Sequence, residues 1–343
     1  MSTAIILLIL VIVVALAFEY INGFHDAANA IATVVSTKVL TPRKAILYAA
    51  VLNFFGAFAG THVAKTIGSD IVDKVAVSQE VILCALIGAI IWNLITWFFG
   101  IPSSSSHALI GGLLGAAIVH NGFGIVHLDG LISKVIIPMF ASPLIGFAVG
   151  FLMMLSLLWI FAKASPERIN KKFKVLQLFS AGIMAFSHGS NDAQKTMGII
   201  TLSLFTYAAA HPGCFLEPFL PQSGHFSVPV WVIFICAVTM ALGTAAGGWR
   251  IIRTLGTRVI KLKPIHGFAA ETTAAGTILT CSFFGIPVST THIISTAIMG
   301  VGSTIRFSAV KWGLVGNIVL AWFLTIPISA LLSAVLYKLF VGA

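Results

Sequence analysis

The sequence is poor in charge, and this scarcity decides its class before any motif is considered. Asp, Glu, Lys and Arg make up 9% of its 343 residues, whereas hydrophobic residues make up 58%; soluble domains carry about 25% charged residues. The mean hydropathy is +1.04. The apolar residues form continuous runs rather than the short alternating segments of a membrane β-barrel. We therefore predict an all-α polytopic membrane protein.

Cysteine is also scarce, and the familiar signatures of enzymes are missing. The four cysteines are scattered along the chain, so they give neither a disulfide framework nor the paired spacing of a zinc site. No Gly-x-Ser-x-Gly nucleophile motif is present, and this disfavours an intramembrane Ser/His enzyme. The first apolar run has no basic leader and no small-residue cleavage site, which indicates a retained helix rather than a signal peptide. We expect no enzymatic activity and no cofactor.

Two hydroxyl-rich turns interrupt the apolar runs, one in each half of the chain. They read Gly100-Ile-Pro-Ser-Ser-Ser-Ser-His107 and Gly285-Ile-Pro-Val-Ser-Thr-Thr-His292. A broken helix in lipid is costly unless its polar groups line a cavity or a ligand site. Hydroxyl donors and free N–H groups at a helix start suit an oxyanion, although Ser and Thr also serve as ordinary N-caps. The predicted anion site comprises Ser103, Ser104, Ser105, Ser106, Ser289, Thr290 and Thr291, with His107 and His292 as supporting residues.

Four acids are expected at membrane depth, namely Glu19, Asp26, Asp192 and Glu271. Each isolated charge there costs about 2.5–3.5 kcal/mol or more, so such residues usually face a cavity and act in it. For Glu19 and Glu271 a structural role is as good an explanation as a functional one.

Two Asp motifs place polar residues on one helix face. Asn22, Asp26 and Asn29 are spaced i, i+4 and i+7, and the second motif repeats this spacing with His188, Asp192 and Lys195. Carboxylate and amide oxygens are hard ligands that suit a cation such as Na⁺, and Asn191 and Gln194 add further amides. Lys195 can neutralise Asp192 or meet an anion. We expect each motif to lie in a helix broken at its glycine.

The basic residues are unevenly distributed over the loops. The segments 38–44, 163–174 and 249–266, with Arg306 and Lys311, carry 15 of the 20 Lys and Arg and a single acid. Segment 61–80 has two Lys and three acids, whereas its counterpart 249–266 has five basic residues and no acid. Because basic loops stay on the cytoplasmic side, equivalent loops of the two halves face opposite sides. This orientation also explains the net charge of +10 without nucleic-acid binding.

These patterns predict two inverted-topology repeats with broken helices, the signature of secondary transporters. Two re-entrant helical hairpins, 81–119 and 267–304, would enter the membrane from opposite sides. We expect the protein in the cell membrane, which is the inner membrane of a cell that has two, with both termini on the outer side. The predicted parts are a first repeat at 1–162, a basic cytoplasmic linker at 163–174 and a second repeat at 175–343.

The motifs resemble those of the inorganic phosphate transporter (PiT) family over essentially the whole chain. The resemblance rests on Gly23-Phe-His-Asp-Ala-Ala-Asn-Ala30, on Phe186-Ser-His-Gly-Ser-Asn-Asp-Ala-Gln-Lys195 and on the two Gly-Ile-Pro turns. It implies phosphate held at the centre by Ser104, Ser105, Ser106, Thr290, Thr291 and Gln194. It also implies cation coupling through Asp26, Asn29, Asn191 and Asp192, which would be the ligands of any Na⁺.

One departure bears on the coupling ion. Many members of that family have Asn-Asp in both motifs, whereas the first motif here reads His25-Asp26. Histidine titrates near neutral pH and could carry a proton, and the chain is similar in this to the bacterial low-affinity branch, which is associated with metal–phosphate uptake. We expect phosphate import by H⁺ or Na⁺ symport, with a sulfate carrier, a metal–phosphate carrier or an anion channel as alternatives. The sequence is also compatible with a homodimer.

Overall fold

The computed structural model describes residues 3–74, 76–214, 216–221 and 226–342, and helices account for nearly all of the regular structure in them. An isolated bridge between Val72 and Val126 is the β pairing found in these residues. The helices are α1 (Thr3–Ser36), α2 (Pro42–Gly56), α3 (His62–Lys65), α4 (Gln79–Phe99), α5 (Ser105–Asn121), α6 (Leu128–Leu131), α7 (Ile137–Ile160), α8 (Pro166–Ala210), α9 (Val230–Ala246), α10 (Trp249–Arg253), α11 (Pro264–Phe283), α12 (Thr290–Ser303) and α13 (Trp312–Phe340).

Short π- and 3₁₀-helical segments connect several of these helices. The π-helical segments are η1 (Thr66–Asp70), η3 (Ile132–Ile136) and η5 (Thr254–Arg258), and the 3₁₀ segments are η2 (Phe123–Ile125), η4 (Glu217–Phe219) and η6 (Phe307–Ala309). By length and apolarity, four helical stretches can cross a membrane: α1, α4, the stretch 128–160 and α13. The helix α9 and the stretch 249–258 form a fifth when their 59° bend is counted as one broken span. The expected all-helical membrane architecture is confirmed.

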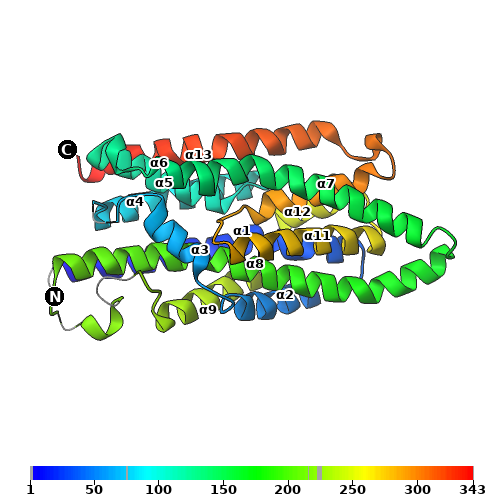
Figure 1. Cartoon of the computed structure of the whole chain (residues 1–343), viewed down its shortest axis with the longest axis horizontal. Helices are drawn as coiled ribbons and strands as arrows, with labels where there is room; N and C mark the ends of the chain where they lie inside the picture. Colours follow the sequence, from blue (N-terminus) through cyan, green and yellow to red (C-terminus); the bar gives the residue numbers. More distant parts are fainter. Residues whose placement is uncertain (1–2, 75, 215, 222–225, 343) are drawn as a thin grey trace.

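Two helical hairpins form the centre of the molecule. The helix α4 packs on α5, and α11 packs on α12; in Figure 1 the first pair comes in from the left end of the bundle and the second from the right. A glycine in the left-handed region follows each first helix, Gly100 with φ 65° and Gly285 with φ 66°, a conformation that glycine adopts without a Cβ penalty. We call residues 100–107 and 285–292 the first and second tip. Both predicted breaks are confirmed.

The helices that carry the Asp motifs are continuous, and here the expectation of a break was wrong. The helix α1 runs through Gly23, and α8 runs through Gly189. Both glycines serve close packing instead. A Cβ on Gly23 would lie 2.7 Å from the Met240 carbonyl oxygen of α9, and one on Gly189 would lie 2.2 Å from that of Asn53 in α2. A glycine that lets two backbones approach looks, in a sequence, like one that breaks a helix.

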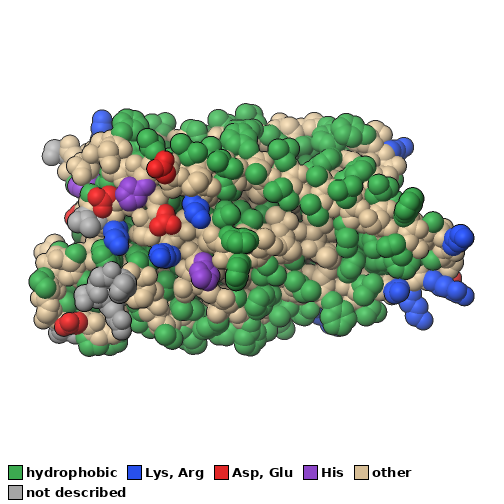
Figure 2. Space-filling model, in the orientation of Figure 1, with side chains coloured by type: hydrophobic (Ala, Val, Ile, Leu, Met, Phe, Trp, Pro, Cys, Tyr) green, Lys and Arg blue, Asp and Glu red, His purple; other side chains and the backbone are tan. Residues whose placement is uncertain are grey.

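The two ends of the bundle differ in charge. Most of the predicted linker forms the first turns of α8, which begins at Pro166. This turn projects at the right end in Figure 1, while both chain termini lie at the left end. Figure 2 shows Lys and Arg gathered at the right end, a largely apolar surface across the middle, and acids, His and Lys mixed at the left end. The inverted relation of the two halves stays a prediction.

Candidate functional site

The two tips meet at one lysine of α8. The Lys195 ammonium donates hydrogen bonds to Ser106 Oγ of the first tip and, over 3.0 Å, to the Val288 carbonyl of the second. It is also paired with Asp192 Oδ1, one turn earlier on the same helix. The residue is 2% exposed. A buried ammonium is tolerated only when it is paired and hydrogen-bonded, so these contacts tie both tips to α8.

The hydroxyl groups of the tips have different tasks. Ser104 Oγ and Ser289 Oγ each accept a 3.2 Å hydrogen bond from the backbone N–H of the histidine three residues on. These two serines are therefore N-caps, so the alternative of ordinary helix capping, rather than anion binding, holds for them. Ser103 donates to Thr96 of α4 over 2.8 Å. Ser105 Oγ is buried without a partner among the described residues, which leaves it available to a ligand.

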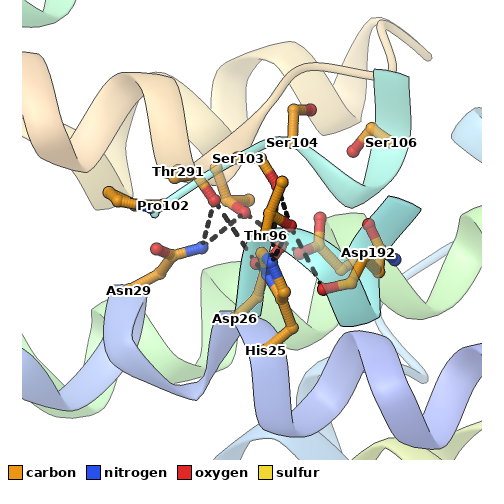
Figure 3. A network of polar contacts seen from close by, with 12 residues as sticks. His25, Asp26, Asn29, Thr96, Pro102, Ser103, Ser104, Ser106, Asp192 and Thr291 are labelled. Carbon is orange, nitrogen blue, oxygen red and sulfur yellow. Dashed lines mark hydrogen bonds and ion pairs between the residues drawn. The ribbon is translucent and has the colours of Figure 1, made fainter. Parts of the chain in front are cut away.

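The first Asp motif connects α1 to both tips (Figure 3). His25 Nδ1 lies 2.7 Å from Asp26 Oδ1, and His25 Nε2 lies 3.0 Å from Thr96 Oγ1, next to Ser103. The Asn29 amide donates to Thr290 over 3.2 Å and to Thr291 over 2.9 Å in the second tip. The motif thus reaches the first tip through His25 and the second through Asn29.

The second Asp motif lies opposite the first. Asp192 Oδ2 accepts a 3.0 Å hydrogen bond from Thr290 and lies 3.0 Å from His188 Nε2. His188 Nδ1 is in turn 3.2 Å from Asn53 Oδ1 of α2, which orients the ring. One ligand atom each from Asp26, His188 and Asp192 lie within 4.8 Å of one another. Carboxylates and an imidazole so close together suit a small cation.

Other predicted residues take part less directly. The Gln194 side chain accepts from the Val63 backbone N–H over 2.8 Å and so caps α3. Its amide donates to the Ser190 carbonyl, and among the hydrogen bonds of the described residues none joins Gln194 to a tip. Asn191 donates to Ser282 of α11 over 2.8 Å. His107 and His292 are the last residues of the two tips; their ring centroids are 4.9 Å apart, and His292 stacks on Trp322.

The two outlying acids lie in separate buried clusters. Glu271 Oε1 accepts from Thr33 over 2.6 Å and from Gln177 over 2.9 Å, and Oε2 accepts from Ser180. Glu19 Oε2 accepts from Thr196. In the described part of the chain, neither carboxylate has a hydrogen bond to a tip residue.

Several contacts of the site were missed in the sequence. Trp322 of α13 donates to the Pro102 carbonyl over 2.9 Å, Thr96 joins His25 to Ser103, and Asn53 orients His188. Asn53 and Thr96 were detectable as polar residues inside apolar helices. Trp322 was not, because a tryptophan in a membrane helix is ordinary and its partner lies 220 residues away.

The site is closed and carries a net charge. Tip residues 103–107 and 289–292 are at most 4% exposed, so this conformation shields the centre from both ends of the bundle. With neutral imidazoles, Asp26, Asp192 and Lys195 sum to one negative charge at the centre. Hydroxyl donors suit an anion there, but the net charge opposes it unless cations bind as well.

Comparisons with known proteins show which family of proteins the chain is similar to. The model of the phosphate transporter family matches residues 22–333. A probable low-affinity inorganic phosphate transporter of Rhizobium meliloti is 49% identical and covers 96% of each chain, and its Bacillus subtilis counterpart is 47% identical over 98% of each. A solved structure titled the sodium-dependent phosphate transporter superposes with a TM-score of 0.86 at 25% identity, over 97% of this chain and 98% of that one.

Proposed function

Because the chain belongs to the phosphate transporter family, whose members are transporters and not enzymes, we propose that it imports inorganic phosphate by cation symport with alternating access. The coupling cation is H⁺ or Na⁺. The observation that carries this proposal is the juxtaposition, in one closed centre, of two hydroxyl-rich tips and two carboxylates.

Electrostatics supports the coupling. Moving a phosphate dianion inward against about 100 mV costs about 4.6 kcal/mol, at about 2.3 kcal/mol per charge. With His25 and His188 neutral, the centre carries one negative charge, so bound phosphate needs cations beside it for local as well as overall balance. Among the described residues, the contact of Lys195 with Asp192 is the one ion pair between a Lys or Arg and these two carboxylates. Cotransported cations at the two Asp motifs supply the rest.

The residues divide into two sets by chemistry. We assign phosphate to the hydroxyl groups of the tips, with Lys195 as the positive charge. Ser105 has no partner in the described part of the chain. Ser106, Thr290 and Thr291 would turn to phosphate from their present contacts with Lys195, Asp192 and Asp26. We assign the coupling cation to Asp26 and Asp192, with His25, Asn29 and Asn191 around them. The N-caps Ser104 and Ser289 shape the tips.

The test is phosphate uptake into proteoliposomes with separately imposed H⁺ and Na⁺ gradients. Symport predicts accumulation above equilibrium with at least one of them and none when both are dissipated by ionophores. Uptake that responds to neither gradient contradicts symport, and unsaturable uptake points to a channel. Excess unlabelled sulfate should not reduce uptake of labelled phosphate if the site is selective.

A metal–phosphate complex is a second candidate substrate, favoured by the cluster of Asp26, His188 and Asp192. Imidazole nitrogen beside carboxylate oxygen is a donor set for divalent transition metals as well as for harder ions. Uptake of a labelled divalent metal that requires phosphate, in the same vesicles, would favour this substrate. Phosphate uptake that is unchanged by chelation of divalent ions would exclude it.

A further inference from the structure

Glu19 is a buried carboxylate that has no ion pair among the described residues. The residue is 0% exposed in the middle of α1. Among the described residues, the ion pairs of the buried acids belong to Asp26 and Asp192, and none belongs to Glu19. The charged groups that act on Glu19 are Asp192 and Lys195 of α8, and Cys236 of α9 also faces it. A carboxylate in such a place is costly as a bare anion.

An oxygen atom of Glu19 and one of Asn22 both lack a hydrogen-bond donor. Thr196 of α8 donates to Glu19 Oε2, whereas Glu19 Oε1 has no partner in the described part of the chain. Asn22 Oδ1 is likewise buried and unpartnered, and Asn22 is 2% exposed. The two residues are three positions apart on α1, so their side chains lie on one helix face. Buried acceptors left open in this way call for a ligand.

Glu271 provides the contrast that makes Glu19 unusual. It is equally buried, but donors reach both of its carboxylate oxygens, from Thr33, Gln177 and Ser180. That arrangement satisfies a carboxylate as it stands. Glu19 receives hydrogen bonds from Thr196 and Asn22, but its Oε1 and the Asn22 Oδ1 stay without a partner in the described part of the chain. Two open oxygens, one of them on a carboxylate, are the donor set of an unfilled cation position.

We infer that Glu19 and Asn22 form a position for one monovalent cation, a proton or Na⁺, separate from the Asp26–Asp192 pair. The inference rests on the proposed symport and adds a step to it. Glu19 lies seven residues before Asp26, about 10 Å along α1, toward the end of the bundle where both termini lie. Its donor Thr196 lies one turn beyond Asp192 on α8. A cation held by Glu19 is therefore one step from the centre on the side of the termini.

The decisive variant is Glu19→Gln, which keeps the shape and one acceptor oxygen but has no charge to balance a cation. We expect the ratio of gradient-driven phosphate accumulation to phosphate–phosphate exchange to fall at least about tenfold, which corresponds to a loss of about one decade in cation affinity. Glu19→Asp, which keeps the charge, should recover part of the ratio. If Glu19→Gln loses only the accumulation driven by a pH gradient, the cation is a proton. If it loses only the accumulation driven by a Na⁺ gradient, the cation is Na⁺.

Two further variants keep the inference falsifiable. Asn22→Leu removes the second oxygen and should raise the cation concentration for half-maximal uptake about tenfold. Thr201→Val, also buried on α8, is the matched control and should keep the wild-type ratio. Suppose that the wild type responds to a gradient, but Glu19→Gln and Asn22→Leu either accumulate phosphate as the wild type does or lose exchange and accumulation equally. Either outcome overturns this inference and leaves the proposed function standing. A wild type that responds to neither gradient overturns the proposed function.

Discussion

Lys195 is the side chain through which the substrate centre holds together. It joins Asp192, Ser106 of the first tip and the Val288 carbonyl of the second. From the sequence, Lys195 was equally well interpreted as a partner of Asp192 or as a ligand of an anion. Its contacts show the first role, and the second stays a prediction. Its reach to both tips could not be predicted, because Ser106 and Val288 lie about 90 residues away on either side.

We expect Asp26→Asn and Asp192→Asn both to abolish coupled uptake, but with different effects on stability. Asp192→Asn leaves a buried Lys195 without its counter-charge, at a cost of about 3–5 kcal/mol. Asp26→Asn costs less, because its partner His25 can be neutral. The melting temperature of the purified protein should therefore fall further for Asp192→Asn than for Asp26→Asn. The double variant Asp192→Asn with Lys195→Met should regain stability but not uptake. Equal melting of the two single variants, or wild-type uptake in either, would contradict the assignment.

At the scale of elements, the breaks of the hairpins were predictable and the uses of the other glycines were not. Gly, Pro and four consecutive serines disfavour a continuous helix, so the local sequence was enough to predict the break at residues 100–107. Gly23 and Gly189 are set by the neighbouring backbones of α9 and α2, and the sequence contains no local sign of such tertiary contacts. The same applies to α3, η1, α10 and η5, which lie in segments expected to be loops.

Two threonines at the start of π-helical segments clamp the tips from the opposite half of the chain. Thr66 of η1 donates to the Gly285 carbonyl over 2.7 Å, and Thr254 of η5 donates to the Gly100 carbonyl over 2.8 Å. Each left-handed glycine is thus held by a segment from the other half of the chain. π-helical turns are frequent at functional sites, and these two are placed to cover the centre from either end.

We therefore expect Thr66→Val and Thr254→Val to open the centre from opposite sides. Loss of one such hydrogen bond costs about 1 kcal/mol, or about a fivefold shift in the population of open molecules. A cysteine placed at Ser105 in a background without the native cysteines should react about fivefold faster with a membrane-impermeant thiol reagent, from one side for each variant. Thr66→Ser and Thr254→Ser keep the hydroxyl and serve as controls. Faster labelling from the same side in both variants would contradict the clamp assignment.

Across the whole molecule, charge separates the two ends. Glu167 is the single acid in the segments that carry 15 of the 20 Lys and Arg, and Figure 2 shows Lys and Arg gathered at one end. This asymmetry was readable in the sequence because the positive-inside bias acts on loops, which need no tertiary contact to be recognised. Long-range pairs such as Pro102 with Trp322 were not readable, since nothing in either segment marks the other.

The orientation of the whole molecule follows from this asymmetry and can be measured directly. Both termini lie at the end opposite the basic turn that begins α8 (Figure 1). We therefore expect them outside the cytoplasm. Alkaline phosphatase fused after residue 342 should be active, because its disulfides form only in an oxidising compartment, and green fluorescent protein at the same point should stay dark. The matched control is the same pair of reporters inserted at 161–165, where the outcome should reverse. A fluorescent C-terminal fusion would invert the molecule in the membrane, and the Glu19 position would then face the cytoplasm.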